Sequence, residues 1–364
     1  MPKYKLIAEV EGMRPLTFIS EDKNSLLCCS GYKLYIYSLR DKNFKFITSY
    51  RPDRSILDFV GRLFPRVFRY GFTSACEFTN GEILLSDGKF FYKHQLILKS
   101  SIEKLQCAFK PPMNLTIDRK LSIHYMGEYL QYGEPNAPYV YSYSPSVGFQ
   151  EIYKFPVNEI DHIHGVFVDK DSKLKILTGD FSVGVGVYNY DLKESIASRW
   201  LLAGQQGRLC WLFSSGDSYL SATDTQVDSN FLIKFASDGS VDQLIGELPG
   251  SSIYYHHYDD EVVFSTTVEP GKPKFGNILD LLDWTIGPGI KDRSARIYSY
   301  KLWDGNAVEL ICVEKDIIPA RLGQFGTFTF PGGRGPADVL VSYGIGVKRF
   351  HDSVLIFDRD VTND

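Results

Sequence analysis

Long apolar runs, a basic charge excess and paired cysteines are all missing from this sequence of 364 residues. No apolar stretch approaches the ~20 residues that a transmembrane helix needs. The opening stretch, MPKYKLIAEVEG, also lacks the apolar core of a signal peptide. We therefore expect no transmembrane segment and a cytoplasmic location.

The charge is nearly balanced, since 40 Lys and Arg residues stand against 44 Asp and Glu residues, for a formal net charge of −4. A protein that binds nucleic acid needs a basic stripe that displaces counterions from the phosphates. Because no long run of one sign occurs here, the sequence predicts no nucleic-acid partner.

The cysteines form no CxxC pair, and most of them lie inside apolar, strand-like runs. Such cysteines are typically buried free thiols in a reducing compartment. No ligand spacing recurs among them, so we expect no zinc site built from cysteine. The six residues are Cys28, Cys29, Cys76, Cys107, Cys210 and Cys312.

Motifs that bind cofactors or carry out well-known reactions are missing too. We find no glycine-rich phosphate loop, no convincing GxSxG nucleophile elbow and no HExxH zinc helix. We therefore expect no organic cofactor, whereas the sequence leaves open whether a metal is bound.

Aromatic residues are abundant, with 25 Phe, 23 Tyr and 4 Trp. Aromatic and β-branched side chains suit the pleated, half-buried surface of a sheet. Short apolar or alternating runs, separated by turns rich in Gly, Asp, Asn and Ser, dominate the chain and indicate strands joined by hairpins. The sequence thus predicts an all-β protein.

One unit recurs: an apolar strand, a turn, a strand ending in small polar residues, an aromatic strand, a turn and a fourth strand. Repeats of this length are typical of ring-shaped and stacked folds. The aromatic third strand is the clearest copy. It occurs as KLYIYSL (33–39), KFFYKHQ (89–95), YVYSYS (139–144), GVYNYD (186–191), FLIKFASDG (231–239), RIYSYKLWDG (296–305) and SVLIFD (353–358).

Seven copies in 364 residues give an average spacing of 52 residues, which fits a four-stranded blade with its loops. We therefore predict a single β-propeller domain over residues 1–364 with about seven blades. The last copy lacks a fourth strand, and KYKLIAEV at the N-terminus is a spare strand that would pair with it and close the ring. Six blades, or two separate sandwiches, are the structural alternatives.

Two segments interrupt the repeat. Residues 51–72 carry five arginines among spaced apolar residues, with Pro65 interrupting any helix. Residues 270–292 contain NILDLLDW, which predicts one or two turns of amphipathic helix. Both segments could cover a blade edge or support a homo-oligomer. A lid over the site, or contact of 51–72 with a membrane surface, is the other interpretation.

Polar residues recur where the second strand of each repeat ends. In a propeller, equivalent positions of successive blades form a ring around one face, so these residues should converge there. Turn positions also favour Asp for backbone reasons alone, which is the structural alternative for any one of them. The set comprises Asp87, Glu128, Asp180, Asp224, Glu269 and Tyr343.

Two histidine clusters begin innermost strands on the same predicted face. DHIHGV supplies His162 and His164, whose spacing of two places them on one side of a strand. YYHHYDD supplies His257 beside Tyr255, and Arg208 opens another such strand. A histidine at a strand start is more often structural than a ligand, so the argument for a site depends on the convergence.

Aromatic rings that stack on sugars, next to carboxylates that bind hydroxyls, indicate a carbohydrate ligand. A carboxylate pair could hydrolyse a glycosidic bond, and a His or Tyr could abstract a proton as in a polysaccharide lyase. We predict catalytic roles for Glu128, His164, Asp180 and Glu269. We predict ligand-binding roles for His162, Arg208, Asp224, Tyr255, His257 and Tyr343.

Two alternatives stay open. His164, Asp180 and Glu128 could instead hold a divalent metal. The chain could also be a non-catalytic interaction scaffold whose rim loops hold a protein partner.

The stretch GEYLQYGEPNAPYVYSYSPSVGFQEIYKF, followed by IDHIHGVFVDKDSKLKILTGD, carries a resemblance to a known family. Over Gly127 to Asp180 the chain resembles sialidase-like propellers with Asp-box (BNR) repeats, bacterial members in particular. An Asp-box reads approximately SxDxGxxW, and Ser146 stands here at the aspartate position. We can assign no counterpart of the sialidase arginine triad. The resemblance therefore implies the fold more than sialidase activity.

Overall fold

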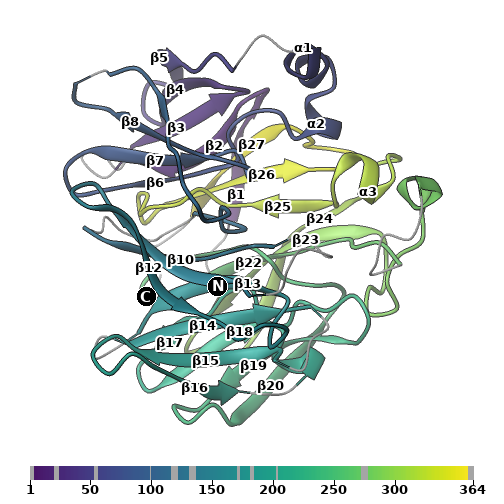
Figure 1. Ribbon diagram of the computed structural model, residues 1–364. Helices are drawn as coiled ribbons and strands as arrows, with labels where there is room; N and C mark the ends of the chain where they lie inside the picture. The colour runs from purple at the N-terminus through teal and green to yellow at the C-terminus, as the bar shows by residue number, and fades with distance from the viewer. Residues whose placement is uncertain are drawn as a thin grey trace.

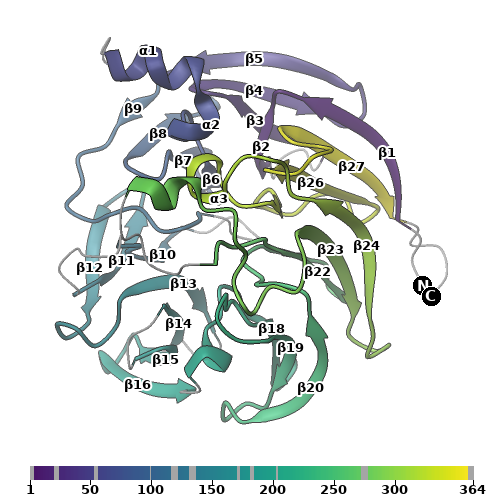
Figure 2. The same ribbon diagram turned by 90° about the vertical axis from the view of Figure 1, so that its right-hand side faces the viewer.

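The computed structural model describes most of the chain, and strands make up most of what it describes. Their sheets are arranged around a ring, as seen along the ring axis in Figure 2 and from the side in Figure 1. The described residues are 4–19, 24–52, 56–98, 100–115, 122–130, 137–169, 173–180, 184–201, 204–271 and 278–359.

Seven sheets form the ring, so the predicted seven-bladed β-propeller is confirmed. Blade 1 consists of β2 (Arg14–Phe18), β3 (Ser25–Ser30), β4 (Lys33–Ser38) and β5 (Asn43–Ser49). Blade 2 consists of β6 (Ser74–Glu77), β7 (Glu82–Ser86), β8 (Phe91–Gln95) and β9 (Glu103–Lys104). Blade 3 consists of β10 (His124–Gly127), β11 (Tyr139–Ser144) and β12 (Gly148–Lys154).

The remaining blades have four strands each. Blade 4 consists of β13 (His162–Val168), β14 (Lys173–Gly179), β15 (Gly186–Asp191) and β16 (Ile196–Leu201). Blade 5 consists of β17 (Phe213–Ser215), β18 (Ser218–Ala222), β19 (Asn230–Phe235) and β20 (Val241–Leu248). Blade 6 consists of β21 (Tyr255–His257), β22 (Glu261–Thr266), β23 (Ser294–Lys301) and β24 (Ala307–Glu314). Blade 7 consists of β25 (Thr327–Thr329), β26 (Val339–Ile345), β27 (Ser353–Arg359) and β1 (Tyr4–Glu11).

Six of the seven aromatic repeats are the third strands of four-stranded blades, as predicted, and YVYSYS forms the middle strand of the three described in blade 3. The turns after two of them, ASDG and LWDG, end in Gly239 and Gly305, whose φ angles are +89° and +70°. Glycine adopts this left-handed conformation at little cost, which suits a tight hairpin. The aromatic side chains fill the space between blades: one cluster joins Phe91 of blade 2 to Tyr141 of blade 3.

Blade 3 departs from the predicted four strands, since only three are found among its described residues. Its β10 takes the position of a second strand, and the segment before it contains Pro111 and Pro112 in place of an innermost strand. Proline has no N–H to donate to a sheet ladder. Hydrogen bonds still link this segment to the blade, among them those from the Tyr129 N–H to the Pro111 carbonyl at 3.4 Å and from the Tyr141 hydroxyl to the Lys110 carbonyl at 2.8 Å.

The first and last strands close the ring, as predicted. β1 pairs antiparallel with β27, from Tyr4 opposite Arg359 to Glu11 opposite Ser353. Arg359 also ties blade 7 to blade 6, because its Nε donates to Glu261 Oε2 at 2.7 Å while its guanidinium lies 4.2 Å from the Tyr258 ring centre. These groups are buried, and a buried charge is tolerated when it is paired in this way.

Short helices gather on one face of the ring. These are α1 (Ile56–Leu63), α2 (Pro65–Phe68), η3 (Ile278–Leu282) and α3 (Ala320–Gly323), whereas η2 (Gly204–Gly207) follows blade 4. α3 contacts both α2 and η3, and all four of the first group lie side by side in Figure 2. In an antiparallel blade the second and fourth strands end on the same face of the ring. α1 and α3 follow fourth strands and η3 follows a second strand, so this group of helices lies on that face. Both interruptions of the repeat thus occupy the predicted site face.

Two features of the first interruption were expected from its sequence. α1 ends before Pro65, which begins α2, so the proline does separate two helices. The Arg66 guanidinium anchors α2 by donating to the Gly323 carbonyl and pairing with Asp316. No helix in the described parts of the chain is both long and apolar enough to cross a membrane.

The closure can be tested with a matched pair of substitutions in β1. Leu6 packs into the core between blades 6 and 7, whereas the neighbouring Ile7 is 46% exposed. We expect Leu6→Asp to lower the free energy of unfolding by on the order of 1–3 kcal/mol, because it places a charge against apolar side chains. Ile7→Asp should change it by less than about 0.5 kcal/mol. Urea unfolding measures both, and equal effects would contradict the closure.

Candidate functional site

The centre of the site is the start of β13, where a β-bulge repositions one histidine. His162 pairs with Gly179 and Ile163 with Thr178, but the register then shifts so that Gly165 pairs with Leu177. His164 is therefore the extra residue of the bulge. Bulges redirect side chains and are common next to functional sites.

The neighbouring strand leaves room for the redirected ring. A Cβ on Gly179 would lie 2.0 Å from His164 Nε2, so only glycine is compatible with this histidine position. Asp180 follows with a φ of +71°, a left-handed conformation that is uncommon outside glycine. The end of β14 thus brings a carboxylate next to both histidines.

Arg208 joins the carboxylates of two blades. One of its terminal nitrogens, Nη2, lies 3.1 Å from Asp180 Oδ1 and 3.4 Å from Asp224 Oδ2. Arg208 and Asp224 are buried, with 7% and 3% of their side chains exposed. Their attraction offsets the cost of removing both charges from water, which an unpaired buried charge could not do.

The tautomer of His164 follows from its contacts. Its Nδ1 lies 3.0 Å from the Leu209 carbonyl, which can only accept a hydrogen bond, so Nδ1 carries the proton. Burial, followed by the nearby His162, lowers the pKa of His164 to about 3. The ring is therefore neutral at physiological pH, with its lone pair on Nε2.

Cys210 lies beside this histidine. Its Sγ is 3.1 Å from Asp224 Oδ2 and 3.3 Å from His164 Nδ1. Burial and the Asp224 charge raise the pKa of the Cys210 thiol well above its ordinary value. Cys210 is therefore a thiol that donates to Asp224. It lacks the thiolate character that a nucleophilic cysteine needs.

Glu269, from blade 6, is buried beside these charges. Burial raises its pKa to about 8, with a further rise from Asp224, while Arg208 acts in the opposite direction. Glu269 is therefore mainly protonated at neutral pH. Three carboxyl groups share this site with one arginine, and protonation of one of them reduces their mutual repulsion.

Several buried polar atoms of the site have no hydrogen-bond partner within the described structure. They are His162 Nε2, Asp224 Oδ1 and Glu269 Oε2. Buried polar atoms in native proteins are nearly always paired with protein, water or an ion. Bound water or an ion at this cluster would satisfy them.

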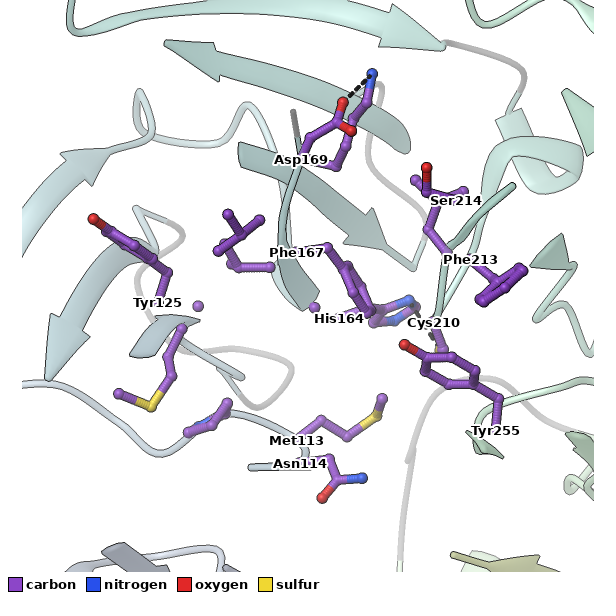
Figure 3. A pocket seen from close by; sticks show the side chains of 18 of the residues that line it. Met113, Asn114, Tyr125, His164, Phe167, Asp169, Cys210, Phe213, Ser214 and Tyr255 are labelled. Atoms are coloured by element: carbon purple, nitrogen blue, oxygen red, sulfur yellow. Dashed lines mark hydrogen bonds and ion pairs between the residues drawn. The ribbon is translucent and has the colours of Figure 1, made fainter. Parts of the chain in front are cut away.

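A chamber of about 280 Å³ lies along the channel beyond His164. It is lined by β13 from His164 to Asp169, so it extends from the middle of that strand to its end, away from the carboxylate cluster. Figure 3 shows His164 and Cys210 at its inner end, with Phe167, Phe213 and Tyr255 around it. The Tyr255 ring stacks on the buried Trp211 at 5.1 Å.

The structure brings six of the ten predicted site residues into one cluster. These are His162, His164, Asp180, Arg208, Asp224 and Glu269. Tyr255 and His257 line the chamber instead. The predicted convergence of these residues on one face is thus observed in part. The chemical roles predicted for them stay predictions.

The other two residues have structural contacts. Glu128 accepts hydrogen bonds from the backbone N–H groups of Lys110 and Tyr139, at 2.8 and 3.0 Å, one on each carboxylate oxygen. The Tyr343 hydroxyl donates to Asp352 and its ring lies 5.2 Å from the Arg14 guanidinium, at the junction of blades 7 and 1. We therefore leave both out of the proposals below.

Two residues of the cluster were missed by the sequence analysis. Tyr129 directly follows Glu128, and its ring centre lies 4.2 Å from that of His162. Cys210 lies two positions after Arg208, a spacing that could have placed it on the same side of an extended segment. The thiol was interpreted only as a core residue.

Comparison with known proteins identifies the fold and no family. No family model and no curated protein matches this chain. The WD40 β-propeller domain of Doa1 matches 98% of this chain and 98% of its own, with 10% identity and a TM-score of 0.60. An oligogalacturonate lyase in complex with manganese matches 98% and 96%, with 7% identity and a TM-score of 0.60.

A second oligogalacturonate lyase, from Vibrio parahaemolyticus, matches 98% of this chain and 97% of its own, with 9% identity and a TM-score of 0.56. Likenesses at this level show the fold alone, and propellers of this shape include both enzymes and WD40 domains. The resemblance to sialidase-like proteins is supported in its fold and gains no family match.

The protonation of Glu269 predicts a pH dependence of stability. A carboxyl group whose pKa is higher in the folded chain holds its proton there between pH 4.5 and about 8. The raised pKa of Glu269 therefore stabilises the folded chain fully below pH 4.5, and this stabilisation is lost as the pH rises through about 8. Relative to wild type, Glu269→Gln should gain more than about 1 kcal/mol in free energy of unfolding between pH 5 and 9.

Urea unfolding at several pH values measures this difference. Comparing the variant with wild type cancels the contributions of the other titrating groups. A difference that does not change with pH would show that Glu269 is ionised in the folded chain.

Proposed function

We propose that this protein binds a small, sugar-like ligand in the channel chamber. One observation carries the proposal: an aromatic-walled chamber of about 280 Å³ ends at His164 and Cys210, which belong to a buried polar cluster with unsatisfied atoms. Concave sites with mostly apolar walls and a few polar groups are the usual form of small-ligand sites.

The walls of the chamber suit the faces of a sugar ring. Tyr255 is held flat against Trp211, and Phe213 lies 5.1 Å from the His257 ring centre. Because these rings are fixed by their neighbours, little side-chain entropy is lost when a ligand stacks on them. His164 and Cys210 form the inner end of the chamber.

The opposite end of the chamber is polar. Lys175 and Asp169 lie 3.6 Å apart there, and Lys175 also donates to Asn189 at 2.7 Å. Asp169 accepts a hydrogen bond from the Tyr219 hydroxyl at 2.7 Å. Such held groups suit the hydroxyls or the carboxylate of a sugar acid.

Binding, rather than a particular reaction, is the function that these contacts support. Asp169 is the one acidic residue among the described residues that line the chamber. A hydrolase with two opposed carboxyl groups therefore has no support there. Two structural neighbours are oligogalacturonate lyases, which makes uronates the first ligands to test.

The test is a panel of mono- and oligosaccharides, uronates included, titrated by calorimetry. We expect at least one to bind, and Tyr255→Ala and Phe213→Ala to weaken it by at least about tenfold, since lost stacking of 1.4 kcal/mol has that effect. Phe46→Ala is the control, because Phe46 is 54% exposed on the outer strand β5.

The alternative role, a scaffold without a ligand, predicts the opposite result. No sugar of the panel would then bind, or binding would be equal in wild type and in both chamber variants. Release of reducing ends or unsaturated uronates in the same samples would add a hydrolase or lyase activity to the binding.

A further inference from the structure

We propose that His162, His164 and Asp180 bind one divalent transition-metal ion at the inner end of the chamber. This site goes beyond the proposed binding of a sugar, because an ion can occupy it in the absence of any ligand. The three residues come from two adjacent strands, and each offers one ligand atom within 4.8 Å of the others.

The distance between His162 and Asp180 fits a shared ion better than a hydrogen bond. Nδ1 of His162 lies 3.4 Å from Asp180 Oδ2. This exceeds the 2.7–3.2 Å of an ordinary N–H···O hydrogen bond. Two ligands at about 2.1 Å from a tetrahedral ion lie about 3.4 Å from each other.

The second observation is that His162 is buried and unsatisfied. Only 3% of the residue is exposed, and its Nε2 has no partner in the described structure. Its Nδ1 has only the long contact with Asp180. An ion between Nδ1 and Asp180 would replace this long contact with two direct bonds, whereas Nε2–H would still need a water.

His164 has the hydrogen bond that a metal-binding histidine usually has. Its Nδ1–H donates to the Leu209 carbonyl at 3.0 Å, which fixes the ring and leaves the Nε2 lone pair available. Metal-bound histidines typically donate their second ring N–H to a carbonyl or carboxylate in this way. The Nε2 atom lies against Gly179, directly before Asp180.

Asp180 can serve the ion and Arg208 at once. Its Oδ1 contacts the Arg208 guanidinium at 3.1 Å, which leaves Oδ2 for the ion. The arginine thus orients the carboxylate without occupying the ligand position. Asp224, which is also paired with Arg208, supplies a second negative charge close to the site.

A neighbouring group of possible ligands is less suitable. His164, Cys210 and Asp224 also lie within 4.8 Å of one another. In that group, however, the histidine nitrogen that faces the others is Nδ1, which already donates to Leu209. The predicted set of His164, Asp180 and Glu128 is also disfavoured, because backbone N–H groups occupy both Glu128 oxygens.

The ligand chemistry indicates the class of metal. Two imidazole nitrogens and one carboxylate oxygen suit Zn²⁺, Mn²⁺, Fe²⁺ or Co²⁺, whereas Ca²⁺ and Mg²⁺ prefer oxygen ligands. Such a set leaves coordination positions open. Because His164 lines the chamber, an open position there could accept an oxygen of a chamber ligand.

The test is titration of the full chain, freed of metal with a chelator, with Co²⁺ and with Zn²⁺ by calorimetry. We expect one ion per chain, with affinity reduced at least about tenfold in His162→Gln and in Asp180→Asn. His94→Gln is the matched control, because His94 is a buried histidine of blade 2 outside the cluster. Circular dichroism and thermal unfolding without metal establish that each variant is folded.

The absorption spectrum of the Co²⁺ form identifies the ligands. Bands of a nitrogen- and oxygen-ligated ion, without thiolate-to-metal charge transfer, are expected. A charge-transfer band would assign the ion to Cys210 and overturn the proposal. Absence of binding, or equal binding in wild type and the two folded ligand variants, would also overturn it. Sugar binding measured in the metal-free protein tests the chamber separately.

Discussion

The pairing of β1 with β27 is the constraint on which the rest of the structure depends. It joins residues from opposite ends of the chain, Tyr4 with Arg359, and converts a row of blades into a ring. An open row would leave two sheet edges unpaired and would not fix the distance between blades. The contact of Arg359 with Glu261 links this closing blade to blade 6. Once the ring is closed, the starts of the inner strands can approach one another only at the channel.

The site is a consequence of that approach. His162 and Asp180 come from blade 4, Arg208 precedes blade 5, and Glu269 follows the second strand of blade 6. No one of these segments could bury its charge alone, because the cost of desolvation is repaid only by partners on other blades. Because Glu269 is protonated and His164 is neutral, the cluster buries fewer charges than its residue types would carry in water. The aromatic chamber begins where this cluster ends, and His164 belongs to both of them.

The fold could be predicted from sequence because its signals are local. Aromatic third strands such as YVYSYS, their turns and the spare N-terminal strand all appear in short windows, and repetition around the ring reinforces them. The position of acidic residues at second-strand ends followed from the same alignment. Side-chain direction could not be predicted. The bulge at His164 and the turn of Glu128 towards the N–H groups of Lys110 and Tyr139 depend on contacts between distant segments. For the same reason the sequence placed Tyr255 with the carboxylates, whereas it lines the chamber.

The central claim is that charged side chains of different blades meet in one buried cluster at the inner end of the chamber. A double-mutant cycle on Asp180 and Arg208, which lie 3.1 Å apart, tests it most directly. Asp180→Asn, Arg208→Gln and the double variant would be compared with wild type by urea unfolding in metal-free buffer. The account predicts a coupling energy of roughly 0.5–3 kcal/mol, as found for contacting charged residues. Additive effects of the two substitutions would contradict it.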